Sequence, residues 1–340
     1  MGLTAGSTGR NAVDNGLVIR REQKDDRVIA LAGNPNVGKS TLFNELTGMN
    51  QHTGNWPGKT VTNAQGRHQG KERGYILVDL PGTYSLLAHS AEEECARDFI
   101  CFGGADAAIV VCDATCLERN LNLVFQTMEI TPRVVVCVNL LDEAKRKNIH
   151  IDLQALSERL GVPVAGTSAR SGRGLEELME YTEQLCSGQL QPSPLQVKYP
   201  AAVETAIGMV EPHVRPFTGE KMNARWVSLK LIDEDPALLS AVTAFLETDL
   251  GAQPSVAEAL QLARAYLVEN GIPIELLKDK ITSSLIVTAE RTVQGVVRVE
   301  KSRRQERDRK LDRILTSRWT GIPIMLLLLA GIFWLTIEGA

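Results

Sequence analysis

The chain has 340 residues, of which 44% are hydrophobic and 23% are charged, and its formal net charge is −4. These values are typical of a globular protein with room for two domains, and the charge provides no general attraction to nucleic acid. The six cysteines have neither the spacing of a disulfide framework nor that of a paired zinc site, so we expect reduced, packed thiols.

Residues 1–26 are rich in Gly, Ser, Thr and charged side chains, which predicts a mobile tail without a signal peptide. After this tail, short apolar runs alternate with amphipathic stretches. The runs are continuously apolar, as is typical of parallel strands covered on both faces. This rhythm predicts a doubly wound α/β domain over residues 27–188. The expected strands are 28–33, 75–80, 107–114, 133–139 and 162–168, and the expected helices are 38–47, 91–102, 117–129, 152–160 and 174–187.

The rest of the chain divides by composition. Residues 189–200 carry prolines and polar side chains and predict a linker, and residues 201–297 predict a small all-helical domain. Residues 298–318 contain nine Lys or Arg against four Asp or Glu. Residues 319–337 are nineteen uncharged residues, about 28 Å long as a helix, which is close to the thickness of a bilayer core. We therefore expect a basic juxtamembrane segment followed by a transmembrane helix.

The sequence "GNPNVGKS" (33–40) follows the first expected strand and opens the first expected helix. This is the G-x-x-x-x-G-K-S phosphate-binding loop in its required context. Its glycines allow backbone N–H groups to surround phosphate oxygens, while Lys39 is expected to bind the β- and γ-phosphates and Ser40 to bind Mg²⁺. The residues expected to contact nucleotide here are Gly33, Asn34, Pro35, Asn36, Val37, Gly38, Lys39, Ser40 and Thr41.

The sequence "DLPG" (79–82) ends the second expected strand. Asp79 is expected to hold the Mg²⁺ shell, and Gly82 to donate its N–H to the γ-phosphate; Leu80 and Pro81 complete this nucleotide-binding loop. By itself the motif is an ordinary turn signal. Its order and distance after the phosphate-binding loop favour the functional interpretation.

Two further loops predict a base-binding site. In "NLLD" (139–142), Asp142 is expected to accept hydrogen bonds from N1–H and the exocyclic amine of guanine, and Asn139 to brace the loops, with Leu140 and Leu141 between them. In "TSAR" (167–170), a backbone N–H near Ala169 is expected to read guanine O6, with Ser168 and Arg170 beside it. Loops at the carboxyl ends of successive parallel strands face one crevice. Together they predict a guanine-nucleotide-binding GTPase.

The sequence "GNWPGKT" (54–60) lies where a nucleotide-sensitive switch is expected. Its glycines and proline predict an irregular loop, because they disfavour helix and strand. Thr60 is expected to place its hydroxyl on Mg²⁺ and its N–H on the γ-phosphate while that phosphate is present. The expected Mg²⁺ ligands are thus Ser40, Thr60 and Asp79.

The motifs "GNPNVGKSTLFNELTG", "GNWPGKTV", "VDLPGTYSL", "NLLDEA" and "TSARSGRGLEEL" resemble those of the ferrous iron transport protein B family over roughly residues 28–340. The resemblance implies a TRAFAC-type G domain that hydrolyses GTP to GDP slowly, since Thr83 stands where a water-positioning glutamine would be. It also implies a K⁺ ion held by Asn36 and by carbonyls of Gly54 and Trp56. The expected catalytic residues are Lys39, Thr60, Gly82 and Asn36.

The same resemblance implies the cytosolic head of a bacterial Fe²⁺ transporter in the inner membrane, with residues 1–318 on the cytoplasmic side. Its implied partners are GTP or GDP, membrane lipids, a downstream transmembrane region, a small FeoA-type accessory protein and further copies of the chain. The alternative is a soluble ribosome- or RNA-assembly GTPase of the Era/Der/TrmE type. That alternative predicts a basic RNA-binding domain, whereas residues 201–297 are mixed in charge, so we expect no nucleic-acid partner.

Overall fold

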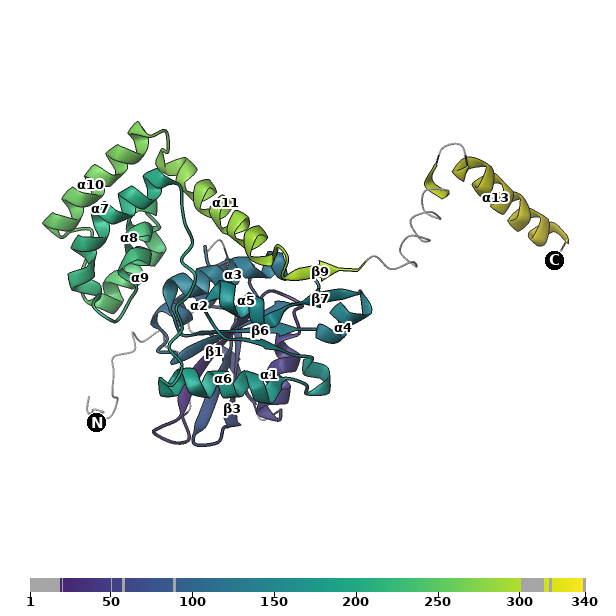
Figure 1. Cartoon of the computed structure of the whole chain (residues 1–340), viewed down its shortest axis with the longest axis horizontal. Helices are drawn as coiled ribbons and strands as arrows, with labels where there is room; N and C mark the ends of the chain where they lie inside the picture. The colour runs from purple at the N-terminus through teal and green to yellow at the C-terminus, as the bar shows by residue number, and fades with distance from the viewer. Residues whose placement is uncertain are drawn as a thin grey trace.

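The computed structural model describes residues 19, 21–49, 51–56, 59–87, 90–300, 315–317 and 320–338. Within these ranges an α/β domain is followed by a helical domain that lies against it (Figure 1). Most of the predicted N-terminal tail and most of the basic segment 298–318 lie outside the described residues.

Five parallel strands form the centre of the α/β domain, in the order β4-β1-β5-β6-β8. All five were predicted, because their apolar runs are buried on both faces. Residues 28, 30 and 32 of β1 belong to one apolar cluster and residues 29 and 31 to another. The strands are β1 (Arg27–Gly33), β4 (Gly74–Asp79), β5 (Ala107–Asp113), β6 (Val134–Asn139) and β8 (Val164–Gly166).

The helices of this domain divide between the two faces of the sheet. Side chains of α1 (Lys39–Thr47) and α6 (Leu175–Ser187) share the smaller cluster, which includes Leu42 and Leu178. Side chains of α2 (Ala91–Phe102), α3 (Leu117–Ile130) and α5 (Leu153–Leu160) belong to the larger cluster, which includes Phe99, Leu121 and Leu156. The doubly wound arrangement is therefore confirmed, and each predicted helix agrees within one residue at either end.

An antiparallel hairpin that the sequence did not predict extends the sheet. Strand β3 (Thr62–Gln69) pairs antiparallel with β4, and β2 (Gln51–Asn55) pairs antiparallel with β3, so the sheet is mixed. The prediction that the segment beginning at Gly54 has no regular structure is wrong for Gly54 and Asn55, which lie in β2. Backbone pairing at a sheet edge needs no apolar pattern, and "QHTGN" provides none.

The helical domain contains α7 (Ala201–Thr218), α8 (Ala224–Asp233), α9 (Pro236–Leu246), α10 (Pro254–Glu269) and α11 (Ile274–Val293). Its buried residues belong to the same apolar cluster as α2, α3 and α5, so the core continues from one domain into the other. Arg97 of α2, only 2% exposed, strengthens this junction because it pairs with Asp235, the N-cap of α9, at 3.3 Å.

After α11 the chain returns to the α/β domain. Strand β9 (Val297–Val299) pairs antiparallel with β7 (Ile149–Ile151), a strand that follows the short helix α4 (Leu141–Arg146). The predicted basic segment thus begins inside a strand. The other predicted domain boundaries stay predictions.

The C-terminal helix α13 (Gly321–Glu338) coincides with most of the predicted transmembrane run, whose first residue, Trp319, is not described. Among the described residues, no helix meets the combined length and hydropathy required of a membrane span. The predicted transmembrane helix is therefore unconfirmed.

Candidate nucleotide-binding site

The phosphate-binding loop connects the end of β1 to the start of α1. Asn36 (φ 65°) and Gly38 (φ 81°) have left-handed backbones, which turn the loop sharply before the helix begins. A Cβ added to Gly38 would lie 2.5 Å from Asn139 Nδ2, so only glycine fits. Gly38 is the N-cap of α1 and provides no capping side chain, which leaves the first N–H groups of the helix available to an anion.

Lys39 and Asp79 bring the first two motifs together. The Lys39 ammonium donates to the Asp79 carboxylate and, at 2.6 Å, to the carbonyl of Leu80. Burial raises the pKa of the Asp79 carboxyl, and the charge and hydrogen bond of Lys39 offset part of that shift. Because Lys39 is only 8% exposed, the two groups form a largely desolvated ion pair.

The loop "DLPGT" packs directly on the phosphate-binding loop. Thr83 N donates to Gly33 O at 3.2 Å, and a Cβ on Gly82 would lie 3.4 Å from Pro35 Cα. Thr83 is buried, and its hydroxyl donates to Ser85 O at 2.6 Å. That hydroxyl is therefore committed to hydrogen bonds within the protein.

Asn139 connects three loops from a fully buried position. Its Nδ2 donates to Val37 O at 2.9 Å, and its Oδ1 accepts from Thr167 Oγ1 and from Ala169 N, each at 3.0 Å. These bonds match the bracing role expected of Asn139. They also engage the Ala169 N–H, and the prediction that a backbone N–H near Ala169 reads guanine O6 stays a prediction. Thr167, which the prediction omitted from the site residues, completes the network.

Asp142 stands at the start of α4, where the left-handed Leu140 (φ 64°) turns the chain after β6. Its backbone N–H donates to Ser168 Oγ at 3.2 Å, which joins the two expected base-binding loops. Its carboxylate accepts from Arg146 Nη2 at 2.9 Å. Partial burial acts to raise the pKa of Asp142, but the hydrogen bond and charge of Arg146 outweigh it and lower the pKa. Arg146 is a site neighbour that the motif analysis missed, although its i+4 spacing on a short helix was a usable signal.

The predicted switch segment forms the tip of the β2–β3 hairpin. Trp56 N donates to Val61 O at 2.7 Å, and Lys59 N donates to Trp56 O at 3.0 Å. The Trp56 side chain is 5% exposed and packs edge-on against Phe99 of α2, with ring centroids 5.6 Å apart. The tryptophan therefore anchors the hairpin tip on α2. Thr60 is exposed, and Pro57 and Gly58 are not described.

The oxygen donors around Asp79 fit Mg²⁺, because the partly buried Asp79 carboxylate lies beside the helix start that carries Ser40. The residues predicted to hold K⁺ come from two segments, the phosphate-binding loop and the β2–β3 hairpin. Asn36 is exposed, but Gly54 lies within β2 and the Trp56 carbonyl already accepts a hydrogen bond. In the phosphate-binding loop, the buried Asn34 Oδ1 has no hydrogen-bond partner among the described residues.

The mixed sheet, the phosphate-binding loop and the two loops joined by Asn139 and Ser168 define a P-loop G domain of the GTPase class. Comparison with known proteins identifies the family within this class. Residues 27–182 match the family model for ferrous iron transport protein B, and residues 199–298 match the model for the FeoB cytosolic helical domain.

Curated relatives and solved structures agree with both matches. The Fe(2+) transporter FeoB of Escherichia coli K12 is 35% identical over 263 residues, and that of Salmonella typhimurium LT2 is 37% identical over 265 residues. Each alignment covers 67% of this chain and 34% of the relative, so the chain spans about a third of their length.

Among solved structures, a GDP-bound mutant of S. thermophilus NFeoB has a TM-score of 0.68 at 31% identity, covering 80% of this chain and all of that one. The T. maritima FeoB cytosolic domain in its GMPPNP form has a TM-score of 0.66 at 34% identity, covering 80% of this chain and 99% of that one. The chain belongs to the FeoB family. The alternative of an RNA-assembly GTPase is not favoured, because both domains match FeoB models.

Proposed function

We propose that this chain binds guanine nucleotide and hydrolyses GTP in the crevice formed by the phosphate-binding loop, "DLPGT" and the Asn139 network. The observation that carries the proposal is the position of Asn139, whose amide bonds to both the phosphate-binding loop and the 167–169 loop. One buried side chain thereby fixes the phosphate end of the site relative to its base end. Nucleotide-bound structures of FeoB relatives support it.

Each loop has a separate task in this proposal. The free N–H groups at the start of α1 and the Lys39 ammonium bind the phosphates, and Lys39 exchanges its bond to Asp79 for a phosphate oxygen. Asp142 exchanges its bond to Arg146 for N1–H and the amine of guanine. Ser40 and Asp79 would hold Mg²⁺, which would neutralise phosphate charge. Thr60 and Gly82 then hold the γ-phosphate from the other side.

Hydrolysis in this site is slow, because no described side chain of "DLPGT" is free to orient the attacking water. The family resemblance adds a K⁺ ion at Asn36 as a source of rate enhancement. Hydrolysis rates in KCl and NaCl for wild type and Asn36→Ala test this. Equal wild-type rates in the two salts would contradict K⁺ stimulation.

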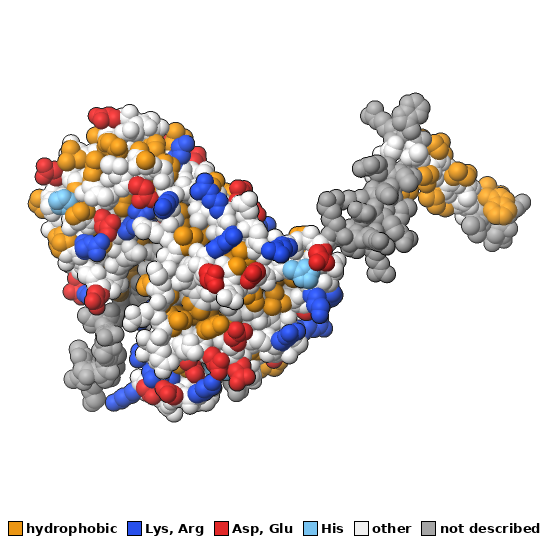
Figure 2. Space-filling view, viewed as in Figure 1, with side chains coloured by type: hydrophobic (Ala, Val, Ile, Leu, Met, Phe, Trp, Pro, Cys, Tyr) orange, Lys and Arg blue, Asp and Glu red, His pale blue; other side chains and the backbone are white. Residues whose placement is uncertain are grey.

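The wider role we propose is that of the cytosolic GTPase head of an Fe²⁺ transporter, as in the curated relatives. The helix α13 supports a membrane location, since it exposes a dense apolar surface that is visible in Figure 2. On α13, the apolar residues that are at least 59% exposed are Leu326, Leu327, Leu328, Ile332, Phe333, Trp334 and Ile337. The downstream transmembrane region, an accessory FeoA-type protein and homo-oligomerisation stay predictions.

Base selection provides the decisive experiment. Calorimetry on the purified chain should show tight binding of GDP and GTP, with ATP weaker by at least about 100-fold, because adenine cannot offer two donors to a carboxylate. Asp142→Asn should shift the preference toward xanthosine nucleotides, whose C2 carbonyl accepts from the new amide. Glu143→Gln, one residue away, is the matched control and should leave selectivity unchanged. Equal binding of ATP and GTP by the wild type would overturn the proposal.

A further inference from the structure

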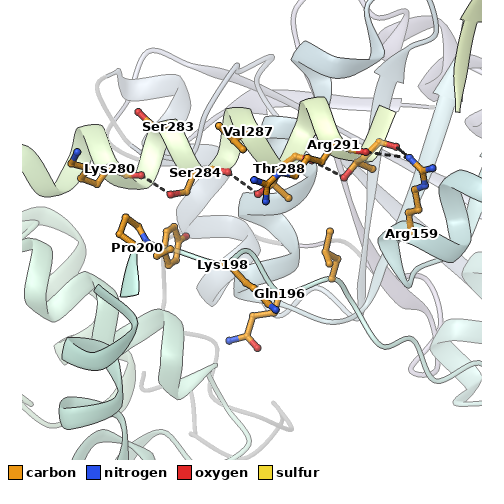
Figure 3. A pocket seen from close by; sticks show the side chains of 13 residues that line it. Arg159, Gln196, Lys198, Pro200, Lys280, Ser283, Ser284, Val287, Thr288 and Arg291 are labelled. Atoms are coloured by element: carbon orange, nitrogen blue, oxygen red, sulfur yellow. Dashed lines mark hydrogen bonds between the residues drawn. The ribbon is translucent and has the colours of Figure 1, made fainter. Parts of the chain in front are cut away.

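A cavity of about 500 Å³ lies away from the nucleotide loops, at the junction of the two domains. Its walls come from α11, from Arg159 of α5 and from the linker residues 195–200 (Figure 3). In Figure 3 the labelled side chains of α11 follow one face of the helix, opposite Gln196, Lys198 and Pro200. The volume falls within the range of natural ligand pockets.

The lining of this cavity is cationic. It contains Arg159, Lys198, Lys280 and Arg291 and no carboxylate, although the whole chain has a net charge of −4. Arg159 is already used, because its Nη1 donates to the carbonyls of Arg291, Thr292 and Gln294 at the end of α11. Within the described residues, no ion pair involves the other three cations. They are exposed and available to an anion.

The remaining lining adds hydrogen-bond acceptors and an apolar surface. The hydroxyls of Ser284, Thr288 and Thr292 donate to carbonyls four residues earlier on α11, at 2.8, 2.7 and 2.8 Å. Their oxygen lone pairs therefore remain able to accept from a ligand. Leu195, Tyr199, Pro200 and Val287 provide apolar contact. A molecule that matches all three features carries phosphate groups, hydroxyls and a carbon skeleton.

We propose that this cavity binds a phosphorylated organic molecule, whose anionic groups contact the cations spread along the cavity, Lys198, Lys280 and Arg291. The ligand bridges α11 and the linker, so its binding holds the helical domain to the G domain. The chemistry is the same for a soluble organic phosphate and for a phospholipid head group. The cavity shares no lining residue with the nucleotide loops. A pyrophosphate-binding event that the cavity variant loses and the control keeps therefore reports on the cavity, even if GDP does not fill the phosphate-binding loop.

Binding of a soluble phosphate compound is tested by adding pyrophosphate to the full chain. The chain is first saturated with GDP and Mg²⁺, so that the phosphate-binding loop is occupied. Calorimetry should show one further binding event for wild type. Lys198→Gln with Lys280→Gln should weaken that event by at least about tenfold, since each charge-assisted contact is lost. The matched control, Lys24→Gln with Lys221→Gln, removes the same charge from exposed positions outside the cavity and should leave the event unchanged.

The lipid source is tested by flotation of the same three proteins with phosphatidylglycerol vesicles and with phosphatidylcholine vesicles. If a lipid head group occupies the cavity, a larger fraction of wild type should float with phosphatidylglycerol vesicles than with phosphatidylcholine vesicles. The Lys198/Lys280 variant should lose this excess and the control should keep it. Added pyrophosphate should abolish the excess by competition. Pyrophosphate binding without that excess assigns a soluble ligand. The proposal is overturned if neither probe distinguishes the cavity variant from the control.

Discussion

The two halves of the candidate site differ in how firmly they are built. The base-binding half has an exposed edge at Asp142 but is built on the fully buried Asn139, whose three hydrogen bonds of about 3 Å join separate loops. The switch half is a hairpin at the edge of the sheet, with exposed residues at Thr53, Gly54 and Thr60 and one large anchor at Trp56. From this difference we expect the loops of the base-binding half to keep their positions when nucleotide binds. We expect the switch half, which has fewer buried contacts, to change conformation with the γ-phosphate.

The largest effect is expected where the preformed half is damaged. Asn139→Ala removes three hydrogen bonds and leaves their buried partners unsatisfied, which should lower the free energy of unfolding by about 4 kcal/mol. Urea unfolding measures this loss, and calorimetry should show guanine-nucleotide binding reduced with it. Asn270→Ala, at the exposed end of α10, provides the control and should cost under about 0.5 kcal/mol. A similar small loss at both positions would show that the network does not hold the loops.

The next effect concerns the anchor of the switch half. Trp56→Ala should cost about 3 kcal/mol, because it empties a buried site against Phe99, whereas Trp56→Phe should keep most of the packing. Hydrogen exchange of residues 51–69 should rise more than that of β6. Lys59→Met breaks the partly exposed ion pair with Glu94, 2.8 Å apart, and should cost only about 0.5 kcal/mol. If Lys59→Met raised hydrogen exchange of residues 51–69 more than Trp56→Ala did, the ion pair with Glu94 rather than the packing on Phe99 would hold the hairpin in place.

The smallest effect is expected at the exposed edge of the base-binding half. The lowered pKa of Asp142 means that its pairing with Arg146 stabilises the folded state above the unfolded pKa of 3.8 and loses this contribution as the pH falls through the folded pKa. Solvent screening limits the contribution to about 0.3 kcal/mol. Arg146→Gln should return the Asp142 pKa toward 3.8 in an NMR titration of the carboxyl carbons. An unchanged pKa would show that Arg146 does not hold this carboxylate.

Much of the molecule could be predicted because its signals are local. Continuous apolar runs identified the five parallel strands, and the order of "GNPNVGKS", "DLPG", "NLLD" and "TSAR" identified the crevice. The β2–β3 hairpin could not be found in this way, since its pairing is made by backbone groups and "QHTGN" has no alternating apolar pattern. Trp56 was noticed as unusual, but its partner Phe99 is 43 residues away and no local pattern connects the two.

The sequence by itself determined which chemical groups occur and in what order: a lysine after a glycine-rich turn, and carboxylates and amides at the ends of buried strands. Those features depend on residue type and on periods of a few residues, which a linear chain displays directly. Only the tertiary structure decided which groups contact one another. Examples are the Lys39–Asp79 ion pair, the hydrogen bond from the Ala169 amide to Asn139 and the cationic cavity beside α11. Each of these joins residues that lie 30 or more positions apart, and burial and approach over such separations are fixed only when the whole core packs.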